Sequence, residues 1–315
     1  MILVTGGLGF IGLHTAQALL DSGEECVLTQ YRVARQPAFI QGEIGKRAFV
    51  EQLDVTDGAR LSEIGDKYPI TGIVHLAVPA LSGGTAAADL RVNMLGLTNI
   101  LEHAERWKVD RISIASSGGV YRAVTDEAHT EDTWLPIEST NPTEAYKKAF
   151  EIVSSHFADR TGIDLLNLRI SGIWGPLYHS MSNLPSRVVH AAVFSSPLRP
   201  GMRGPSYADD GGDMCYVKDC ARGIALLQLA DGLRYRTYNV AAGRPARNGE
   251  FVDAVKELIP EAAVSLPEGH DPGGSGIVGY SDISRIREDT GYEPAYDVRS
   301  GVADYVAWLR AGNAE

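Results

Sequence analysis

The sequence predicts an α/β fold in which a doubly wound parallel sheet is joined by a second, smaller lobe toward the C-terminus. Short apolar runs alternate with amphipathic segments through the first half of the chain, as expected for successive strand–helix units. A glycine-rich segment connects the first apolar run to the first amphipathic segment. After Arg169, frequent glycine and proline residues break this alternation, so a differently built lobe is expected there.

Six short apolar runs are predicted to form strands of the sheet, at residues 2–5, 26–29, 48–53, 72–76, 111–115 and 165–169. Apolar residues recur at helical spacing in the segments 12–22, 87–106 and 144–161. These segments are long enough to serve as crossover helices, which parallel strands require. The alternation therefore favours a parallel sheet over an antiparallel one.

A strand followed by a helix is predicted again at residues 215–229, and another strand at 237–240. Because these segments return to the pattern of the first half, the smaller lobe is expected to be interleaved with the sheet domain. We assign residues 1–170 and 215–245 to the sheet domain, and residues 171–214 and 246–315 to the smaller lobe. The glycine-rich segment 267–279 is predicted to be a mobile loop near the functional site.

The composition is that of a globular protein and disfavours several classes of partner. Of the 315 residues, 44% are hydrophobic and 22% are charged. The formal net charge of −11 disfavours nucleic acid or an anionic membrane as a partner, since both would be repelled. No segment contains the roughly 18 consecutive apolar residues that are needed to span a bilayer.

The three cysteines, Cys26, Cys215 and Cys220, form no CxxC pair and are too few for a disulfide framework. They fit a reducing compartment, so we expect a cytoplasmic protein. The sequence predicts no metal site. We expect a homodimer that binds a small-molecule substrate.

The segment between the first strand and the first helix has the features of a dinucleotide-binding loop. Gly6, Gly9 and Gly12 follow a GxxGxxG spacing directly after a strand and at the start of a helix. Without side chains, the backbone can turn tightly and approach a pyrophosphate, which then lies against the N–H groups of the helix N-terminus. Phe10 and Ile11 belong to the same turn. The context of strand, turn and helix predicts a Rossmann-type dinucleotide site.

The whole chain resembles the extended short-chain dehydrogenase/reductase group, the NAD-dependent epimerase/dehydratase family. The resemblance rests on the TGGLGFIG segment and on further motifs in matching order and spacing: 54–57 (DVTD), 75–77 (HLA), 93–96 (NMLG), 116–117 (SS), 168–169 (LR), 175–176 (GP), 216–219 (YVKD) and 291–294 (GYEP). It implies a nicotinamide dinucleotide in the sheet domain and a substrate held by the C-terminal lobe. The residues expected to bind the cofactor are Gly6, Gly9, Phe10, Ile11, Gly12, Gln30, Arg32, Asp54, Val55, Leu76, Ala77, Asn93 and Lys147.

The resemblance places the Asp54 segment at the adenine and the Ala77 segment beside the ribose and the nicotinamide. The choice between NAD and NADP depends on the end of the second strand, where an acidic residue would bind the ribose 2′-hydroxyl. This chain has Gln30 there, and Arg32 and Arg35 follow. Because a carboxylate that would repel a 2′-phosphate is absent from this position, the sequence leaves both NAD and NADP open.

In the family that the chain resembles, a Ser or Thr acts together with the Tyr and Lys of a YxxxK pattern. The phenol exchanges a proton with the substrate oxygen, and the lysine lowers the phenol pKa and binds the nicotinamide ribose. The resemblance gives the catalytic residues as Ser117, Thr143 and Lys147, with Thr143 at the tyrosine position. A threonine hydroxyl can hold a substrate oxygen but is a far weaker acid than a phenol. Tyr146 lies about 100° around the helix from Lys147, so it is expected to pack rather than to replace the phenol.

Two further departures narrow the chemistry that the resemblance implies. Sugar 4,6-dehydratases carry Asp-Glu after the Ser or Thr, where this chain has Gly118 and Gly119. Nucleotide-sugar epimerases carry a diphosphate-binding arginine where this chain has Gly212, and no arginine stands in the later segment 268–271. The candidates to replace that arginine are Arg187, Arg199 and Arg203, for each of which a surface salt bridge is an equal expectation, and the candidates for a second acid or base are Tyr121, His179 and His270.

The leading hypothesis is an NAD(P)-dependent oxidoreductase that acts at a hydroxyl or keto carbon of a sugar-like or other polyfunctional small molecule. A nucleotide-sugar epimerase with a rebuilt diphosphate-binding site is the second hypothesis. The third is a non-redox or sensing protein that retains a bound dinucleotide. The fold alone does not distinguish them, because one fold supports many chemistries.

Overall fold

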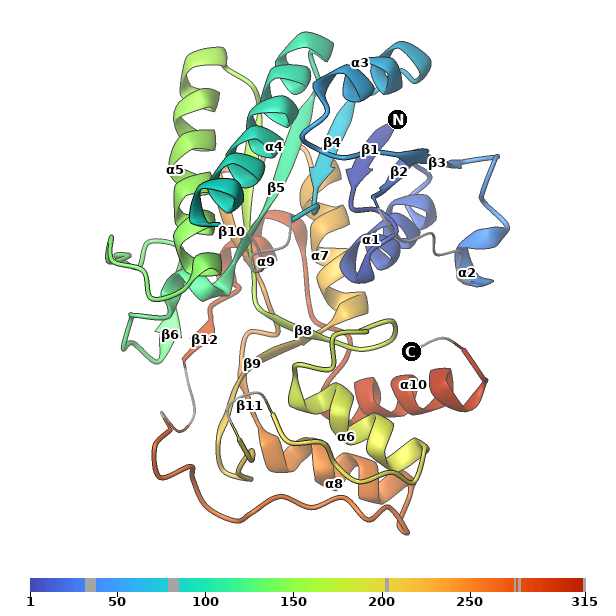
Figure 1. Cartoon of the computed structure of the whole chain (residues 1–315), viewed down its shortest axis with the longest axis vertical. Coiled ribbons are helices and arrows are strands. Elements are labelled where there is room, and N and C mark those ends of the chain that lie inside the picture. The colour runs from blue at the N-terminus through green and yellow to red at the C-terminus, as the bar shows by residue number, and fades with distance from the viewer. Residues whose placement is uncertain (32–37, 79–84, 202–203, 275, 277–278, 314–315) are drawn as a thin grey trace.

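A seven-stranded sheet with the strand order β10-β7-β5-β4-β1-β2-β3 forms the centre of the molecule (Figure 1). The computed structural model describes residues 1–31, 38–78, 85–201, 204–274, 276 and 279–313. The strands are β1 (Ile2–Thr5), β2 (Cys26–Gln30), β3 (Ala48–Gln52), β4 (Gly72–His75), β5 (Arg111–Ser117), β7 (Leu165–Ile170) and β10 (Thr237–Val240). Every neighbouring pair in this sheet is parallel, so the predicted fold class is confirmed.

The order of the strands creates a crevice between β1 and β4. From β1 the chain proceeds outward through β2 and β3, and then crosses to β4 and continues through β5 and β7 on the other side. In open α/β sheets, ligands bind outside the carboxyl ends of the strands at the point where the winding direction changes. The fold therefore places a candidate site at the ends of β1 and β4.

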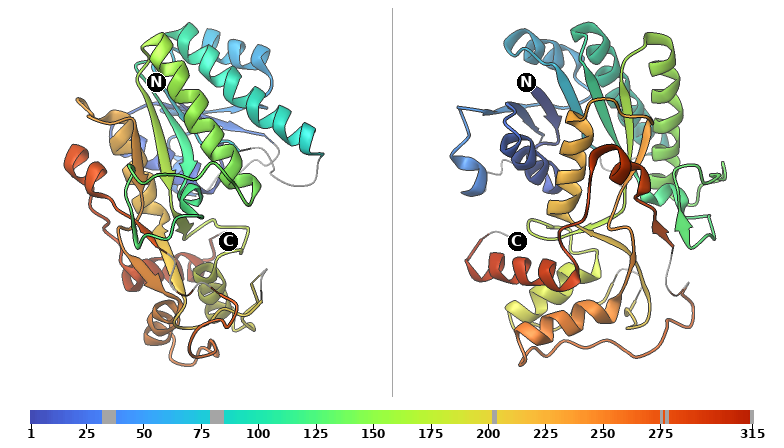
Figure 2. Two further views of the ribbon diagram at one scale, coloured as in Figure 1. Left: turned by 90° about the vertical axis from the view of Figure 1, so that its left-hand side faces the viewer. Right: turned by 180° about the vertical axis from the view of Figure 1, so that it is seen from behind.

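Helices cover both faces of the sheet, and the alternation of side chains along each strand divides the core in two. Ile2 and Val4 of β1 face the cluster that contains α1 (Phe10–Asp21) and α7 (Val217–Leu229). Leu3 faces the opposite cluster, which contains α3 (Gly58–Lys67), α4 (Ala86–Trp107) and α5 (Pro142–Thr161). Seen from behind, α7 lies over the back of the sheet (Figure 2). The short α2 (Ala38–Gln41) follows β2.

Three helices form a separate hydrophobic cluster beyond the carboxyl ends of the strands. They are α6 (Leu184–Val193), α8 (Asn248–Leu258) and α10 (Val298–Arg310), which contact one another and lie below the sheet in Figure 1. Val188, Phe251 and Tyr305 are fully buried among them. The domain boundaries assigned from the sequence at residues 170, 215 and 245 stay a prediction.

Short strands and turns connect the large sheet to the three-helix cluster. A three-stranded sheet is formed by β8 (Gly172–Trp174), β9 (Gly211–Tyr216) and β11 (Pro245–Arg247). A parallel pair is formed by β6 (Ala128–His129) and β12 (Tyr280–Ser281). The remaining elements are the 3-10 turn η1 (Gly118–Tyr121) and α9 (Ser284–Thr290). Because β8 follows β7 almost directly and β9 leads into α7, the chain passes repeatedly between the two regions.

A buried ion pair connects β7 to α5 beneath the carboxyl ends of the strands. Arg169 is 6% exposed, and its guanidinium lies 2.8 Å from the Glu151 carboxylate. The Ser116 hydroxyl of β5 also donates to Glu151. A second guanidinium nitrogen of Arg169 donates to the Tyr121 hydroxyl at 2.8 Å. Four elements, β5, β7, α5 and the turn at Gly118–Tyr121, are therefore held through one carboxylate and one guanidinium.

The hydrogen-bonded network continues from Tyr121 to the far side of the sheet. The Tyr121 hydroxyl donates to Asn239 Oδ1 of β10 at 2.8 Å, and Asn239 Nδ2 donates to the carbonyls of His129 and Asp282, both at 2.9 Å. The Asn239 N–H donates to the Glu131 carboxylate at 2.7 Å. The network thus ties β6 and the segment before α9 to the sheet.

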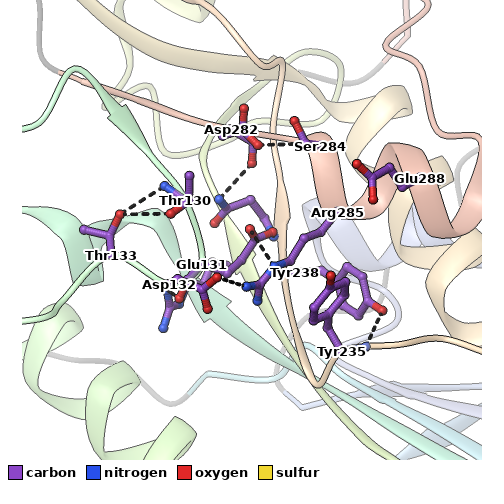
Figure 3. A network of polar contacts seen from close by, with 12 residues as sticks. Thr130, Glu131, Asp132, Thr133, Tyr235, Tyr238, Asp282, Ser284, Arg285 and Glu288 are labelled. Atoms are coloured by element: carbon purple, nitrogen blue, oxygen red, sulfur yellow. Dashed lines mark hydrogen bonds and ion pairs between the residues drawn. The ribbon is translucent and has the colours of Figure 1, made fainter.

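Arg285, on α9, adds further contacts to this network (Figure 3). Its guanidinium lies 3.6 Å from the Glu131 carboxylate, pairs with Asp132, and lies 4.2 Å from the centre of the Tyr235 ring. Arg285 therefore joins the loop after β6 to the loop before β10.

We expect Glu151→Gln to lower the free energy of unfolding by about 3 to 5 kcal/mol, because it leaves the buried Arg169 cation without a counter-charge. Urea denaturation measures this change. Glu63→Gln is the matched control, since Glu63 is 65% exposed in its pair with Arg60 and should cost about 0 to 1 kcal/mol. A similar, small effect of both substitutions would show that the buried pair does not stabilise the sheet region.

Candidate active site

The glycine-rich loop after β1 turns in a way that only glycine accommodates easily. Gly6 has a φ of +67°, in the left-handed region that side chains disfavour. A Cβ at Gly12 would lie 2.2 Å from the Gly6 carbonyl oxygen. The Gly6 N–H donates to the Thr29 hydroxyl at 3.1 Å, which fixes the loop against β2. No side chain caps α1 at Gly9, so the first turn of the helix presents backbone N–H groups suited to an anion.

A cavity of about 420 Å³ begins at this loop and crosses the ends of the central strands. Its walls come from the start of α1, the ends of β4, β5 and β7, and one face of α5. The lining residues are Gly6, Gly9, Phe10, Ile11, Leu76, Val78, Ala115, Ser116, Ser117, Thr143, Lys147, Ile170, Ser171, Ile173 and Tyr178. The cavity thus brings together six of the residues that the sequence assigned to the cofactor or to catalysis, besides Phe10 and Ile11.

Leu76 and Ala77 follow β4 and lie against the glycine-rich loop. A Cβ at Gly6 would lie 3.1 Å from the Ala77 backbone, so the loop approaches this segment as closely as backbones allow. Val55 is 8% exposed and packs against Gly96 of α4, where a Cβ would come within 2.9 Å of it. Glycine at these positions therefore permits the close packing on which the shape of the crevice depends.

Two buried polar atoms of residues that the sequence assigned to the cofactor lack hydrogen-bond partners among the described residues. They are Oε1 of Gln30, at the end of β2, and Oδ1 of Asn93, on α4. Buried polar atoms are seldom left unpaired, so both fit a position beside a polar ligand. The Asp54 carboxylate accepts from the Thr56 N–H at 2.9 Å and shapes the turn after β3. Arg32 lies outside the described residues.

Ser117 ends β5 and has a structural role as well as a position in the cavity. Its hydroxyl oxygen accepts from the Gly119 N–H at 3.0 Å and so caps the turn η1. A Cβ at Gly119 would lie 3.2 Å from this oxygen and 3.9 Å from the methyl group of Thr143. The hydroxyl hydrogen of Ser117 remains available to donate to a ligand, since the bond to Gly119 uses only the oxygen.

Lys147 reaches the cavity from α5 and is 6% exposed. Its ammonium donates to the Ala115 carbonyl of β5 at 2.6 Å. Burial lowers the lysine pKa to about 8, against the opposing effect of the Glu151 carboxylate. Lys147 is therefore mostly protonated at neutral pH and presents a cation beside the ends of β4 and β5.

The start of α5 determines which side chains of the helix face the cavity. The Asn141 side chain accepts from the Glu144 N–H at 3.1 Å, and Pro142 occupies the first turn, so the helix begins before the apolar periodicity does. In this register Thr143 and Lys147 line the cavity. Tyr146 is instead partly buried against the core cluster that contains α3 and α4.

A second cavity of about 730 Å³ adjoins the first, and Ser117 and Ser171 line both. Glycine residues form much of its wall, and its titratable lining groups include Asp126, His129 and Asp213. Asp213 accepts from the Ser281 N–H at 2.8 Å through Oδ2, while Oδ1 has no hydrogen-bond partner in the described part of the chain. Burial raises the pKa of Asp213.

The sequence analysis did not identify Ser171, Tyr178 or Asp213 as site residues. Ser171 follows β7, whose carboxyl end borders that of β5, so the sheet order would have indicated it. Tyr178 follows the Gly175-Pro176 motif by two residues, and its ring packs against Phe10 with centroids 5.0 Å apart. No pattern in the sequence brings Asp213 to this place, because the pairing of β9 with β8 positions it.

The predicted acid or base candidates occupy very different environments. Tyr121 lines the second cavity, but its hydroxyl already bonds to Arg169 and Asn239, and burial raises its pKa to about 12. His270 lies 3.0 Å from Asp210 and lines neither cavity. His179 is exposed and also lines neither cavity.

The fold and the two joined cavities define an α/β protein with a nucleotide-type crevice at the carboxyl edge of its sheet. The chain belongs to the NAD dependent epimerase/dehydratase family, whose model matches residues 2–241. The predicted family is thereby confirmed, and with it the class of NAD-dependent oxidoreductases and epimerases. The assignment of individual residues to catalysis or to cofactor binding stays a prediction.

Individual relatives extend over the whole chain. A dTDP-glucose 4,6-dehydratase of Actinoplanes sp. is 27% identical over 341 residues, covering 99% of this chain and 98% of that protein. The UDP-glucose 4-epimerase of Thermus thermophilus, solved in complex with NAD, is 25% identical with a TM-score of 0.79 and 98% of each chain covered. The UDP-glucose 4-epimerase of Thermotoga maritima, solved with UDP-glucose, has a TM-score of 0.81 at 20% identity, with 99% of each chain covered, and supports the fold.

Within the described residues, no group of three His, Cys, Asp or Glu side chains is arranged to hold a metal ion. None of the helices in the same part of the chain is both long enough and apolar enough to cross a membrane.

We expect Gly9→Val to weaken dinucleotide binding by at least about a hundredfold, or roughly 2.8 kcal/mol. The backbone at Gly9 is extended, with φ −81° and ψ 179°, so valine fits the conformation but its side chain would fill the space beside the helix N-terminus. Calorimetric titration with NAD measures the effect. Gly42→Val is the control, because a Cβ there meets open space. Unchanged NAD affinity in a folded Gly9→Val protein would rule out this loop as the pyrophosphate site.

Proposed function

We propose that this protein binds NAD or NADP along the 420 Å³ cavity and oxidises or reduces a hydroxyl or keto carbon of a sugar-like substrate in the adjoining cavity. The observation that carries the proposal is that Ser117 and Ser171 line both cavities, so a substrate and a nicotinamide ring can meet there. The residues present fit the cofactor, since α1 begins at Gly9 without a side-chain cap and Gln30 and Asn93 offer acceptors that are unpaired among the described residues.

In this proposal each residue at the junction has a distinct task. The bound dinucleotide supplies the hydride acceptor or donor. Lys147 holds the nicotinamide ribose through its ammonium, while Ser117 and Thr143 donate hydrogen bonds to the reacting oxygen. The placement of Thr143 on the cavity side of α5, and of Tyr146 partly buried against the core, supports this assignment. Because no phenol of α5 is among the residues that line the cavity, the site would draw its proton from another group or directly from the substrate.

For the cofactor, NAD is favoured because the similar enzyme of Thermus thermophilus was solved with NAD. Gln30 at the end of β2 provides no carboxylate to reject a 2′-phosphate, so NADP is expected to bind within about a hundredfold of NAD, or roughly 2.8 kcal/mol.

For the substrate, we propose a nucleotide sugar, since the similar proteins are named for UDP-glucose and dTDP-glucose. Dehydration through an Asp-Glu pair is disfavoured, because Gly118 and Gly119 occupy those positions beside Ser117. Transient oxidation followed by reduction, as in epimerisation, is therefore the second candidate reaction, and it requires a different group to hold the diphosphate in place of an arginine at Gly212.

The proposal is tested by incubating the purified protein with NAD or NADP and with UDP-glucose or dTDP-glucose. We expect the absorbance of reduced nicotinamide to appear, transiently for an epimerase and in net amount for a dehydrogenase, with the changed carbon identified by NMR. Cofactor binding without any reduction by these sugars or by a wider panel of polyols would favour the third hypothesis, a non-redox protein that retains the dinucleotide.

We expect Thr143→Val to lower turnover by about 10- to 100-fold, the loss of one hydrogen bond of roughly 1.5 to 3 kcal/mol to the reacting oxygen. NAD affinity should persist, because Lys147 is unchanged. Thr143→Tyr should raise turnover, by up to the roughly 10²- to 10⁴-fold that a positioned acid–base group contributes. Steady-state kinetics measures both effects.

Tyr146→Phe is the matched control for these two variants. It removes a phenol on the same helix that packs against the core, and it should leave turnover unchanged. A large loss of turnover in Tyr146→Phe, with no effect of Thr143→Val, would reassign the proton transfer to Tyr146.

We further propose that the protein is a homodimer formed through α4 and α5. These helices contact each other, and they expose apolar side chains that include Leu90 and Leu95 on α4 and Ile152 and Val153 on α5. Ile152 is 67% exposed. Ile152→Lys should shift the sedimentation velocity toward the monomer, whereas Leu258→Lys, on the exposed surface of α8, should not. A wild-type protein that sediments as a monomer at all concentrations would refute this interface.

A further inference from the structure

Arg187 on α6 is a buried cation without a carboxylate within ion-pair distance in the described part of the chain. It is 7% exposed, nearly as buried as Arg169. Arg169 is compensated by Glu151 at 2.8 Å, whereas no ion pair of Arg187 is formed by any described residue. The sequence allowed Arg187 a surface salt bridge, and the structure places it in neither a surface position nor a salt bridge.

Neutral groups provide the only polar contacts that the described residues offer to the Arg187 guanidinium. Nη1 donates to the Arg199 carbonyl at 2.8 Å, Nε donates to the Asn183 carbonyl at 3.2 Å, and Nη2 donates to the Ser206 hydroxyl at the long distance of 3.5 Å. A guanidinium has five N–H donors, so these contacts leave donors for a ligand. Burial lowers the pKa of Arg187, as expected for a cation that lacks a counter-charge.

A cavity of about 220 Å³ lies beside this guanidinium, and none of the described residues that line it is acidic. Its lining includes Arg187, the exposed Arg199, Ser196 and His190, whose Nε2 lies 2.9 Å from the Tyr305 hydroxyl. In a chain with a net charge of −11, two arginines facing one cavity without a carboxylate create a local positive potential. This potential suits an anionic ligand.

We propose that Arg187 and this cavity form a binding site for a phosphoryl group. A buried charge costs several kcal/mol unless an opposite charge compensates it, and a phosphoryl group supplies both the charge and the acceptor oxygens that the planar guanidinium fits. The alternative role, a structural link between α6 and the segment that contains Arg199 and Ser206, would need only the neutral contacts. A purely structural role would not account for the positive potential of the cavity that Arg187 and Arg199 line.

The phosphoryl group has two possible sources. It belongs either to the diphosphate of the proposed nucleotide-sugar substrate or to a separate phosphorylated molecule. The first source rests on the proposed function, and in that case Arg187 would replace the diphosphate-binding arginine that is absent at Gly212. The phosphoryl site itself does not depend on the redox chemistry.

The test uses inorganic pyrophosphate as the probe, titrated into the full-length protein by calorimetry. Saturating NAD is present, so that the glycine-rich loop is occupied and pyrophosphate cannot bind there. We expect Arg187→Met to weaken pyrophosphate binding by at least about tenfold, or roughly 1.4 kcal/mol. Arg299→Met is the matched control, because Arg299 is 71% exposed and pairs with Glu257, and it should leave the affinity unchanged.

Thermal unfolding separates a binding role from a structural one. Pyrophosphate should raise the Tm of the wild-type protein and not that of Arg187→Met, because a ligand stabilises only the state that it binds. Unchanged pyrophosphate affinity in Arg187→Met, or no binding to the wild-type protein, would overturn the proposal. If Arg187→Met fails to fold, Arg187→Lys keeps the charge but loses the planar fork, and it should bind pyrophosphate more weakly than wild type. Equal binding by Arg187→Lys and wild type would then overturn the proposal.

Competition with UDP-glucose distinguishes the two sources. If the phosphoryl group belongs to the substrate, UDP-glucose displaces pyrophosphate and Arg187→Met weakens both ligands. If it belongs to a separate molecule, pyrophosphate binds in the presence of saturating UDP-glucose, and Arg187→Met weakens pyrophosphate alone. NAD binding is measured in the same proteins, so failure of the proposed function would appear as lost NAD binding or absent reduction and would not be confused with failure of the phosphoryl site.

Discussion

The buried ion pair between Arg169 and Glu151 holds in place the elements that carry the candidate site. Its cost in desolvation is offset by several bonds, since Glu151 accepts from Ser116 as well as from Arg169, and Arg169 also donates to Tyr121. Ser116 is adjacent to Ser117, and Glu151 lies one helical turn after Lys147. The pair therefore fixes both the end of β5 and the rotation of α5, on which the junction of the two cavities depends.

The same carboxylate also influences the charge of Lys147. Glu151 raises the lysine pKa, but burial lowers it by more, so the net pKa is about 8. Because Glu151 is committed to Arg169, it compensates Lys147 only in part. The ammonium is consequently held by one carbonyl, that of Ala115, and keeps donors for a ligand. A cation with this partial compensation is suited to a neutral ribose, whose hydroxyls accept hydrogen bonds without requiring the lysine to give up a salt bridge.

Much of the fold and part of the site followed from local patterns in the sequence. Alternating apolar runs identified the strands, and the spacing of Gly6, Gly9 and Gly12 identified the loop that starts the first cavity. The apolar run predicted that the fifth strand ends at residue 115, whereas β5 continues to Ser117. The strand can include the polar Ser116 because its hydroxyl donates a hydrogen bond to the Glu151 carboxylate. Contacts of this kind join residues far apart in the sequence, and the spacing of apolar residues along the chain does not predict them.

Arg187 and Asp213 illustrate the same limit at the site. An arginine on an amphipathic helix is ordinarily expected at the surface, but Arg187 is buried and donates to the Arg199 carbonyl and the Ser206 hydroxyl. Asp213 enters the second cavity through the pairing of β9 with β8.

Thr143, which we propose stands at the position of the family tyrosine, also affects the shape of the site. Gly118, Gly119 and Gly172 line the second cavity, so backbone contributes part of the wall that Ser117 also lines. A short side chain at residue 143 continues this pattern into the first cavity. Beside these glycines, polar groups such as Asp213 and Ser171 line the cavity and are available for recognition. Such recognition suits a polyhydroxylated ligand, whose hydroxyls can satisfy isolated acceptors, better than an apolar one, which would leave them buried and unpaired.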